Sequence, residues 1–317
     1  MNQQVEVEVT IETNSICLYP KRNVYPLIVP QRCFTDKFGN VNAYVEMNPS
    51  MYMDSEGNTV ILVRCVNYRK FYDKKFTMHE NQSNSIYYCL RGNINDTLNK
   101  LLEVDIFESS LLNYKYSSPT YATYWKGLED IRFISANAIL VTVPECNPGG
   151  MACIFRAIID GSNVHSFVQC SPNIVEKNWM PYFDRQRNEK VIYSLSPFQI
   201  KSVLGDDRQT IELTEENKKK LSGYHGSTNG IHYNESYTLF LIHINKDITL
   251  HRWMLFDQTT NEVWVSSEFI FFTHAYIEFT CSLCRYENRI FISVGVNDDK
   301  AYIIESCIDD VNKMFIM

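Results

Sequence analysis

The chain lacks the features that mark several large classes of protein. Its 317 residues carry 30 Lys and Arg against 37 Asp and Glu, a net charge of −7, so no positive excess is present to hold nucleic acid. The only basic cluster, 218–220, follows two glutamates and is typical of a solvated helical turn. No apolar run approaches the ~18 residues that a membrane-spanning helix needs. We therefore expect neither nucleic acid nor a membrane as a partner.

Signals for secretion, metal binding and cofactor binding are also missing. Residues 1–13 have neither the basic nor the apolar segment of a signal peptide, so we expect a cytoplasmic protein whose 10 cysteines stay thiols. Cys281 and Cys284 form the only C-x-x-C pair, and no second pair is spaced for a structural zinc. Phosphate-binding loops, dinucleotide fingerprints and the Gly-x-Ser-x-Gly motif are absent. The sequence predicts no metal and no cofactor.

Helix signals are few. Residues 94–107 show a helical pattern, and a second helix is predicted between an N-capping Thr214 and a closing Gly223. Nearly everything else alternates apolar and polar residues, as in 5–11, or forms short β-branched runs between Asn, Gly, Asp and Pro. No low-complexity linker divides the chain. We expect one all-β domain over residues 1–317.

A unit of polar motif, short strand, polar turn and second strand recurs along the chain. Five copies begin at Asn48, Leu128, Glu176, Gly226 and Ile277. A period of about 40–50 residues with several strands in each period is typical of a β-propeller. The sequence therefore predicts an all-β, five-bladed β-propeller. Innermost strands begin at the central channel, so the polar residues that head them should converge on one funnel: Asn48, Asp130, Lys177, Asn178, Ser227, Thr228 and Glu278.

Several of these motifs resemble those of the mannoside phosphorylases, a glycoside hydrolase family of five-bladed propellers. The segment GLEDIRFI (127–134) is similar to the family signature Gly-x-Glu-Asp-Pro-Arg, and VILVRCVNY (60–68) resembles its first-blade strand with an Arg. EKNWMPYF (176–183) resembles its Lys-Asn motif. YTLFLIHI (237–244) resembles a fourth-blade strand that ends at a phosphate-binding His, here His243. The resemblance extends over nearly the whole chain.

Other segments look closer to relatives of that family. KNWMPY (177–182), IYSLSP (192–197) and HRWMLFD (251–257) look like the related β-mannosyltransferases. The chain also departs from the family pattern, because Ile131 stands where the signature has Pro and Ile244 stands where a Gly follows the His. The missing Pro loosens the backbone restraint on the preceding residue.

The resemblance implies a carbohydrate-active enzyme that acts on β-mannosides, with Asp130 as the general acid. In the family this acid is thought to act through a substrate hydroxyl. Glycoside cleavage normally needs a second carboxyl group, yet the first-blade motif supplies Asn48, an amide that cannot take a proton. Inorganic phosphate is already an anion and needs no base, but it needs cations, for which the candidates are Arg64, Arg132, Lys177 and His243. The remaining substrate-binding candidates are Asn48, Asn178, Trp179, Thr228 and Glu278.

Strand alternation predicts which side chains face the channel. Asp130 and Arg132 should share one face, and Glu129 should point to the other. An acid must hold its proton, through burial or a neighbouring carboxylate such as Glu129 or Glu278. A structural ion pair with Arg132 at the start of the strand is the competing role for Asp130.

Two of the candidate residues have an equally good structural interpretation. Arg64 is as typical of a buried ion-pair partner, and Trp179 of a core residue. The expected partners are an oligosaccharide or sugar phosphate and inorganic phosphate, and a homo-oligomer stays open. The rival functions are a mannosyltransferase that uses a nucleotide-sugar donor and a non-catalytic glycan-binding propeller.

Overall fold

The computed structural model describes residues 16–36, 38–70, 76–78, 82–102, 109–171 and 175–316. The strand expected at 5–11 lies outside these residues. Within them the strands form five sheets of at least four strands each. The first sheet contains β5 (Val45–Met53), β6 (Asn58–Val66), β9 (Ser83–Asn93), β10 (Ser110–Leu111) and β12 (Trp125–Lys126). The second contains β13 (Glu129–Ser135), β14 (Ala138–Thr142), β15 (Ile154–Asp160), β16 (Asn163–Gln169) and β11 (Asn113–Tyr114).

The other three sheets follow in chain order. The third contains β17 (Met180–Phe183), β18 (Glu189–Leu195), β19 (Phe198–Ser202) and β20 (Gln209–Thr210). The fourth contains β21 (His225–Gly226), β22 (Ile231–His232), β23 (Tyr237–Asn245), β24 (Thr249–Asp257), β25 (Val263–Val265), β26 (Phe269–Ile270) and β1 (Cys17–Leu18). The fifth contains β27 (Glu278–Tyr286), β28 (Arg289–Val296), β29 (Lys300–Cys307) and β2 (Asn23–Pro26).

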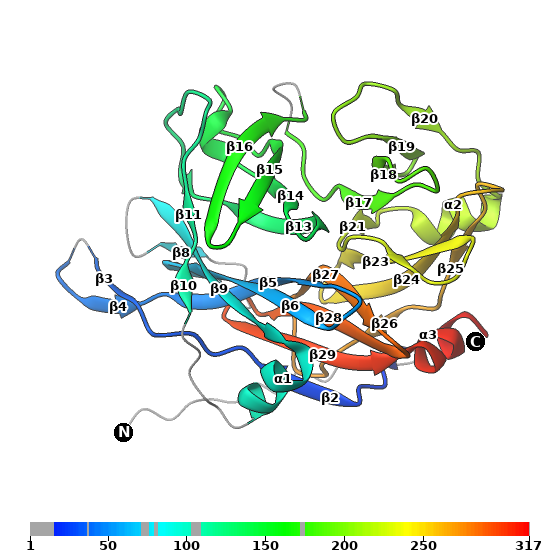
Figure 1. Cartoon of the computed structure of the whole chain (residues 1–317), viewed down its shortest axis with the longest axis horizontal. Helices are drawn as coiled ribbons and strands as arrows, with labels where there is room; N and C mark the ends of the chain where they lie inside the picture. Colours follow the sequence, from blue (N-terminus) through cyan, green and yellow to red (C-terminus); the bar gives the residue numbers. More distant parts are fainter. Residues whose placement is uncertain are drawn as a thin grey trace.

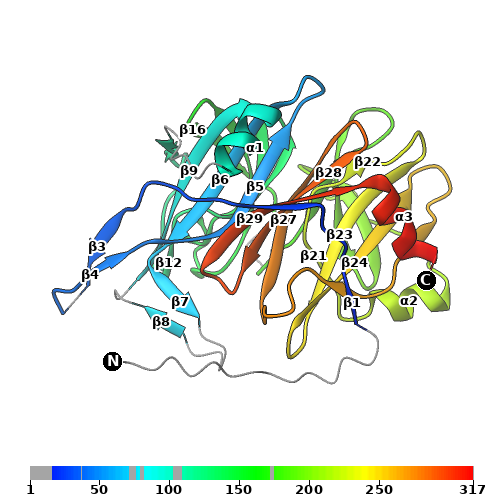
Figure 2. The ribbon, with the colours of Figure 1, turned by 90° about the horizontal axis from the view of Figure 1, so that it is seen from below.

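Two ribbons and three α-helices complete the described elements. The ribbon of β3 (Cys33–Thr35) and β4 (Val41–Ala43) projects from one side of the molecule (Figure 2), and the second ribbon pairs β7 (Tyr68–Lys70) with β8 (Phe76–Met78). The helices are α1 (Ile94–Leu102), α2 (Glu215–Leu221) and α3 (Ile308–Ile316), with a 3-10 turn at Pro144–Cys146. No described helix is long and apolar enough to cross a membrane.

Both predicted helices form. The Thr214 side chain caps α2 by accepting the Asn217 N–H at 3.3 Å, and Gly223 follows the helix with a left-handed φ of +77°. Helix α1 ends at Leu102, whereas the pattern extends to residue 107, and residues 103–108 lie outside the described part. α3 had no counterpart among the predictions.

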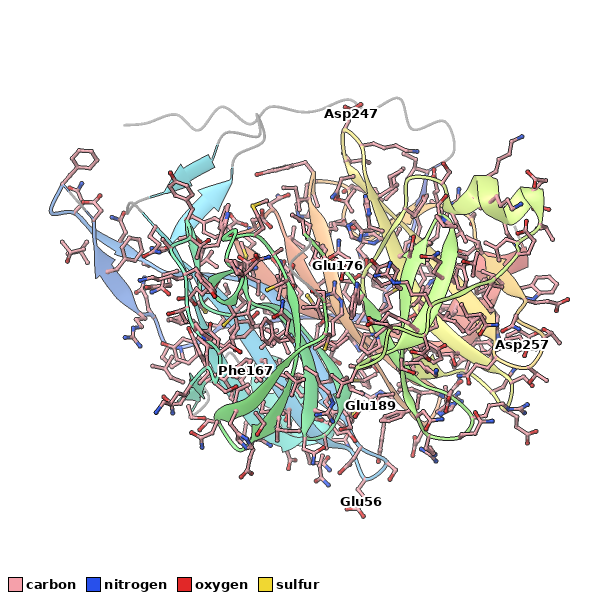
Figure 3. The ribbon with its side chains drawn as sticks, turned by 90° about the horizontal axis from the view of Figure 1, so that it is seen from above. Glu56, Phe167, Glu176, Glu189, Asp247 and Asp257 are labelled. Atoms are coloured by element: carbon pink, nitrogen blue, oxygen red, sulfur yellow. The ribbon has the colours of Figure 1, made fainter. Side chains whose placement is uncertain are left out.

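Three hairpin turns share the spacing Asp-x-x-x-Asn. Asp54 Oδ1 accepts the backbone N–H of Asn58 over 2.8 Å, and the same bond forms in turns 36–40 and 184–188. The residue before each Asn has a left-handed backbone. Figure 3 shows Glu56 at the outer tip of one of these hairpins. The polar turns predicted from the sequence are thus built by Asp side chains that replace missing backbone partners.

The first strands of the sheets surround one axis. β5 contacts β13 and β27, and β13 contacts β17, so these strands meet at the middle of the molecule (Figure 1). β22 of the fourth sheet contacts β27. Apolar side chains fill the spaces between sheets, as where Leu62 of the first sheet packs with Ile131 and Phe155 of the second. β2, near the start of the chain, pairs with β29, near its end, and so closes the arrangement.

The propeller arrangement predicted from the repeats is therefore confirmed. The predicted number of blades is not, because four blades are recognised in the arrangement rather than five. Two sheets depart from a regular four-stranded blade. The third ends in the two-residue strand β20, and the innermost strand of the fourth is divided into β21 and β22.

Candidate functional site

Three of the predicted site residues share an uncommon backbone conformation. Asn48, Asp130 and Asn178 have φ values of +38°, +46° and +66°, in the left-handed region. Asn48 lies in β5, Asp130 in β13, and Asn178 two residues before β17, so each belongs to a different sheet. Asn and Asp enter this region more readily than other non-glycine residues, and non-glycine residues held there are frequent at functional sites. Asn and Asp are therefore the residue types that tolerate the left-handed backbone found at these three positions.

Bulges bring two of these residues together. The register of β5 against β6 shifts between Met47 and Ser50, and that of β13 against β14 shifts between Glu129 and Arg132. Each shift places two residues of the inner strand opposite one of its partner. Asn48 and Asp130 thus occupy the same place in adjacent sheets, and Asn48 Nδ2 donates to Asp130 Oδ1 over 3.1 Å.

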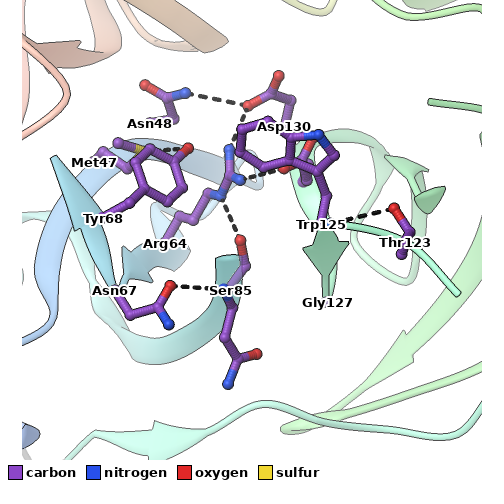
Figure 4. A network of polar contacts seen from close by, with 12 residues as sticks. Met47, Asn48, Arg64, Asn67, Tyr68, Ser85, Thr123, Trp125, Gly127 and Asp130 are labelled. Atoms are coloured by element: carbon purple, nitrogen blue, oxygen red, sulfur yellow. Dashed lines mark hydrogen bonds and ion pairs between the residues drawn. The ribbon is translucent and has the colours of Figure 1, made fainter. Parts of the chain in front are cut away.

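Arg64 holds two carboxylates at this position (Figure 4). Its NH1 donates to Asp130 Oδ1 at 3.2 Å, its NH2 to Glu129 Oε1 at 2.6 Å and its Nε to Ser85 Oγ at 3.0 Å. The Arg64 side chain is 3% exposed, and those of Glu129 and Asp130 are 19% and 17% exposed. The prediction that Glu129 points away from the channel face is therefore wrong, because the bulge breaks the alternation.

Burial and the neighbouring charges shift the pKa of Glu129 in both directions. Burial raises the pKa of Glu129 above its ordinary value, and the nearby Asp130 carboxylate adds to the rise. Arg64 opposes both effects, and Lys177 does so more weakly. Glu129 and Asp130 therefore share a single positive charge, the guanidinium of Arg64. Asp130 Oδ2 has no hydrogen-bond partner among the described residues, which leaves this oxygen for a substrate.

Arg132 ties three sheets together. Its Nε donates to the Ser227 carbonyl, its NH1 to the Asp130 carbonyl at 3.1 Å and its NH2 to Asn178 Oδ1 at 3.3 Å. It is 2% exposed. Arg132 therefore bonds the backbone of Asp130 rather than its carboxylate, and both predicted arginines have protein partners for their charged ends.

His243 lies beside Ser227 at the end of β23. Its Nδ1 is 2.6 Å from Ser227 Oγ, and its ring packs edge-on to Phe279 at 5.2 Å. Burial lowers the pKa of His243 well below its usual range, and the nearby His251 and His225 add to this effect. His243 is therefore neutral near pH 7, and it offers a hydrogen bond rather than a charge.

Three further candidates are buried and contact other protein groups. Thr228 Oγ1 accepts the Leu241 N–H at 3.1 Å. Glu278 is 2% exposed, and its carboxylate accepts two backbone N–H groups and lies 3.0 Å from His251 Nε2. Trp179 is also 2% exposed and packs against Tyr193 at 5.3 Å. These placements favour structural roles, including a core position for Trp179.

A different aromatic residue is better exposed near Asp130. Trp125 is half-buried and packs edge-on to Tyr68 at 5.8 Å. Its backbone N–H donates to Thr123 Oγ1 at 3.2 Å, and Figure 4 draws its indole in the same view as Arg64 and Asp130. Trp125 lies two residues before the motif that begins at Gly127. This closeness to the motif is the one signal in the sequence that could have marked Trp125 as a site residue. Trp125 is the aromatic surface at this site on which a sugar ring could pack.

A cavity of about 450 Å³ opens between the third and fourth sheets. Lys177 is exposed there and makes no ion pair with any described residue. The cavity is lined by Val175, Glu176, Lys177, Asn178, Trp179, Tyr193, Ser194, His225, His243 and Asn245. An adjoining pocket of about 260 Å³ shares five of these residues: Lys177, Asn178, Tyr193, Ser194 and His225.

Several cavity residues were not among the predictions. Glu176, Tyr193 and Ser194 lie inside the motifs 176–183 and 192–197, where the sequence predicted no role for them. His225 and Asn245 lie just outside motif segments, and only the sheet packing shows that all five face one space. Within the described residues no group of His, Cys, Asp and Glu could hold a metal ion. All ten cysteines are free. The polar groups of the site are thus carboxylates, amides, hydroxyls, histidines, two arginines with protein partners, and Lys177 without an ion pair among the described residues.

No protein-family model and no curated protein sequence matches the chain. Solved structures do resemble it. A β-1,2-mannobiose phosphorylase from Listeria innocua superposes with a TM-score of 0.59 at 12% identity, covering 93% of this chain and 99% of that one. A glycosyl hydrolase from Bacteroides ovatus gives 0.56 at 12% identity, covering 92% and 93%. A GDP-Man-dependent mannosyltransferase from Leishmania mexicana gives 0.52 at 11% identity, covering 83% and 85%. The chain therefore has the fold of mannoside phosphorylases and of a related mannosyltransferase, as its motifs indicated.

Proposed function

We propose that the protein is a carbohydrate-active enzyme that transfers a mannosyl group between a β-mannoside and inorganic phosphate, with inversion. The observation that carries this proposal is the polar network of Asn48, Asp130 and Asn178, each in a left-handed conformation in or just before the first strand of a different sheet. Asn48 bonds Asp130 directly, and Arg132 bonds both Asp130 and Asn178. Arg132 joins them to the fourth sheet through the Ser227 carbonyl. Similar folds in a mannobiose phosphorylase and a mannosyltransferase support the choice of substrate class.

We also infer five blades. Each of the five sheets contributes a first strand to the central axis, and β2 completes the last sheet by pairing with β29. The sheets with the short β20 and the divided β21–β22 then count as irregular blades. In such a ring we expect the site residues to share one end of the axis.

Asp130 supplies the proton in this mechanism. Its Oδ1 is fixed by Asn48 and Arg64, so Oδ2 is the oxygen that faces the substrate. Asp130 enters this step protonated at Oδ2. As the bond between the anomeric carbon and the leaving oxygen breaks, that oxygen takes the proton, directly or through a substrate hydroxyl, and Asp130 is left as the carboxylate that Arg64 pairs. A phosphate oxygen forms the new bond from the opposite face of the sugar. Trp125 provides the apolar surface under the ring.

Phosphate occupies the cavity of about 450 Å³ in this proposal. Lys177 is the predicted cation without a counter-ion among the described residues, and Asn178 offers an amide beside it. If the Ser227 hydroxyl donates to His243 Nδ1, the proton of the neutral ring lies on Nε2 and can be donated to the anion. Arg64 and Arg132 contribute indirectly, by fixing Asp130 and Asn178.

A synthesis assay tests the proposal. The protein is incubated with mannose and mannose 1-phosphate, or with mannose and GDP-mannose, and oligosaccharide, phosphate and nucleotide are measured. Product from mannose 1-phosphate alone supports the phosphorylase. Product from GDP-mannose alone would establish the rival transferase, and product from neither would favour a glycan-binding propeller.

The transferase is the second candidate because of one observation. The cavity of about 450 Å³ continues into the pocket of about 260 Å³ between the third and fourth sheets. The combined space is larger than a phosphate ion requires and offers room for a longer donor. Among the cavity residues, Lys177 is the one lysine, and it has no ion pair with a described residue. So few positive charges also suit a nucleotide-sugar donor, which neutral contacts hold in part.

A further inference from the structure

The proposed phosphate cavity contains a carboxylate that the mechanism above does not use. Glu176 lines this cavity, and Figure 3 shows it near the middle of the molecule. Its side chain is 7% exposed. It directly precedes Lys177, and its backbone N–H donates over 3.1 Å to the carbonyl of Ala152, in the loop that leads into β15. A buried acid thus stands beside the cation that would hold the anion.

The two carboxylate oxygens of Glu176 have different surroundings. Oε1 accepts the Tyr193 hydroxyl and lies 3.9 Å from Arg208 NH2. Burial raises the pKa of Tyr193, and its hydrogen bond to Glu176 adds to the rise, so the phenol keeps its proton and remains a donor. Oε2 is buried without a hydrogen-bond partner among the described residues. A buried unpaired oxygen is costly, so Oε2 is an acceptor that a ligand can satisfy.

A ligand of this cavity must therefore offer a proton to Glu176 and negative oxygens to Lys177. Hydrogen phosphate has both, because it keeps a P–O–H group beside its anionic oxygens in neutral water. Sulfate has nearly the same shape but keeps no proton there. A sulfate oxygen facing Oε2 would meet like charge without a hydrogen bond, and such repulsion is a common source of specificity.

We propose that Glu176 makes this site selective for hydrogen phosphate over sulfate, by accepting the phosphate proton at Oε2. The proposal rests on the proposed function, which places phosphate in the same cavity. The neutral state of His243 strengthens the argument, since Lys177 is then the main positive charge among the residues that line the cavity. The other titratable groups close by are Tyr193, Arg208, His225 and the buried Lys201, whose Nζ lies 4.4 Å over the Trp179 ring.

Calorimetric titration tests this selectivity. The protein is titrated with inorganic phosphate and with sulfate at neutral pH and constant ionic strength. We expect phosphate to bind at least about tenfold more tightly, the change that one hydrogen bond to a charged group makes. In Glu176→Gln the amide keeps an acceptor for Tyr193 and presents an N–H to the anion, so the preference should disappear. The matched control is Glu235→Gln, an exposed acid in a turn, which should keep it.

A second variant locates the anion. Lys177→Gln should lower the affinity for phosphate and the affinity for sulfate by a similar factor. Equal affinity of the unmodified protein for the two anions would overturn the selectivity while leaving phosphate transfer intact, and this comparison does not depend on the folding of any variant. An unchanged preference in Glu176→Gln would also overturn it. Binding of neither anion would remove phosphate from the proposed function as well.

Discussion

At the scale of single residues, the site depends on Arg64. Its guanidinium is buried and satisfies Glu129, Asp130 and Ser85 at once. Removing it leaves two partly buried carboxylates facing each other without a counter-charge. A buried charge left without its partner is far more destabilising than the loss of an exposed ion pair.

We therefore expect Arg64→Met to lower the free energy of unfolding by about 3 kcal/mol, near the lower end of the range for broken buried pairs because both acids keep some exposure. Urea unfolding measures this change. Arg91→Met is the control, because Arg91 is exposed and donates to the Gly161 carbonyl rather than to an acid. It should change stability by less than about 0.5 kcal/mol. Equal effects of the two substitutions would show that the network adds little to stability.

His243 gives a prediction about pH. Its pKa is lowered in the folded protein, so the unfolded chain binds the proton more readily. Its contribution to stability is present above the unfolded His pKa of about 6.5 and is lost as pH falls below that value. Compared with His243→Gln, the unmodified protein should lose more stability between about pH 7 and pH 5. Parallel curves from urea unfolding across this range would contradict the assignment of a neutral, buried imidazole.

At the scale of elements, the bulges in β5 and β13 decide the geometry of the site. They turn Asn48 and Asp130 toward each other, and β28 packs closely behind the first of them. A Cβ added at Gly295 would lie 2.4 Å from Asn48 Oδ1 and 2.6 Å from Asn48 N. The second contact is with backbone, so a side-chain rotation cannot relieve it.

Gly295→Ala should therefore displace Asn48 and cost about 1–3 kcal/mol, as for other overpacked sites. Mannoside transfer should fall with it. Gly149→Ala is the matched control, since its added Cβ meets nothing closer than 3.4 Å. Thermal unfolding and the synthesis assay together check the prediction. A Gly295→Ala protein as stable and active as the control would contradict the close packing.

The elements also show how far the sequence could predict the site. Alternation and turn residues were enough for the strands, α2 and the order of the motifs. Alternation failed at Glu129, because a bulge is a property of the pairing between β13 and β14 rather than of either segment. The sequence also did not predict that Tyr193 and His225 line the cavity. They come from the third and fourth sheets, and only the packing of these sheets brings them to one space.

At the scale of the whole molecule, the ring is closed by β2 pairing with β29. Glu305 of β29 accepts Tyr25 OH at 2.6 Å and Asn23 Nδ2 at 2.9 Å, and it pairs with Arg289 at 2.8 Å. This junction joins the two ends of the described chain. The single domain over 1–317, the cytoplasmic location and a homo-oligomer stay predictions.

Glu305→Ala should weaken this closure and lower the free energy of unfolding by about 2–3 kcal/mol, as expected for lost hydrogen bonds to a charged group. Hydrogen exchange should rise first in β2 and β29, because local opening begins where few contacts hold an element. Exchange that rises uniformly over all sheets would contradict a closure that depends on this strand.

The central claim is that Asp130 protonates the leaving oxygen of a β-mannoside while phosphate attacks with inversion. Proton NMR of the products from β-1,2-mannobiose and inorganic phosphate tests this most directly, with the unmodified protein and Asp130→Asn compared. We expect α-mannose 1-phosphate from the unmodified protein and a loss of at least about 10²-fold in the variant. The β-anomer as product, or full activity in Asp130→Asn, would contradict the account.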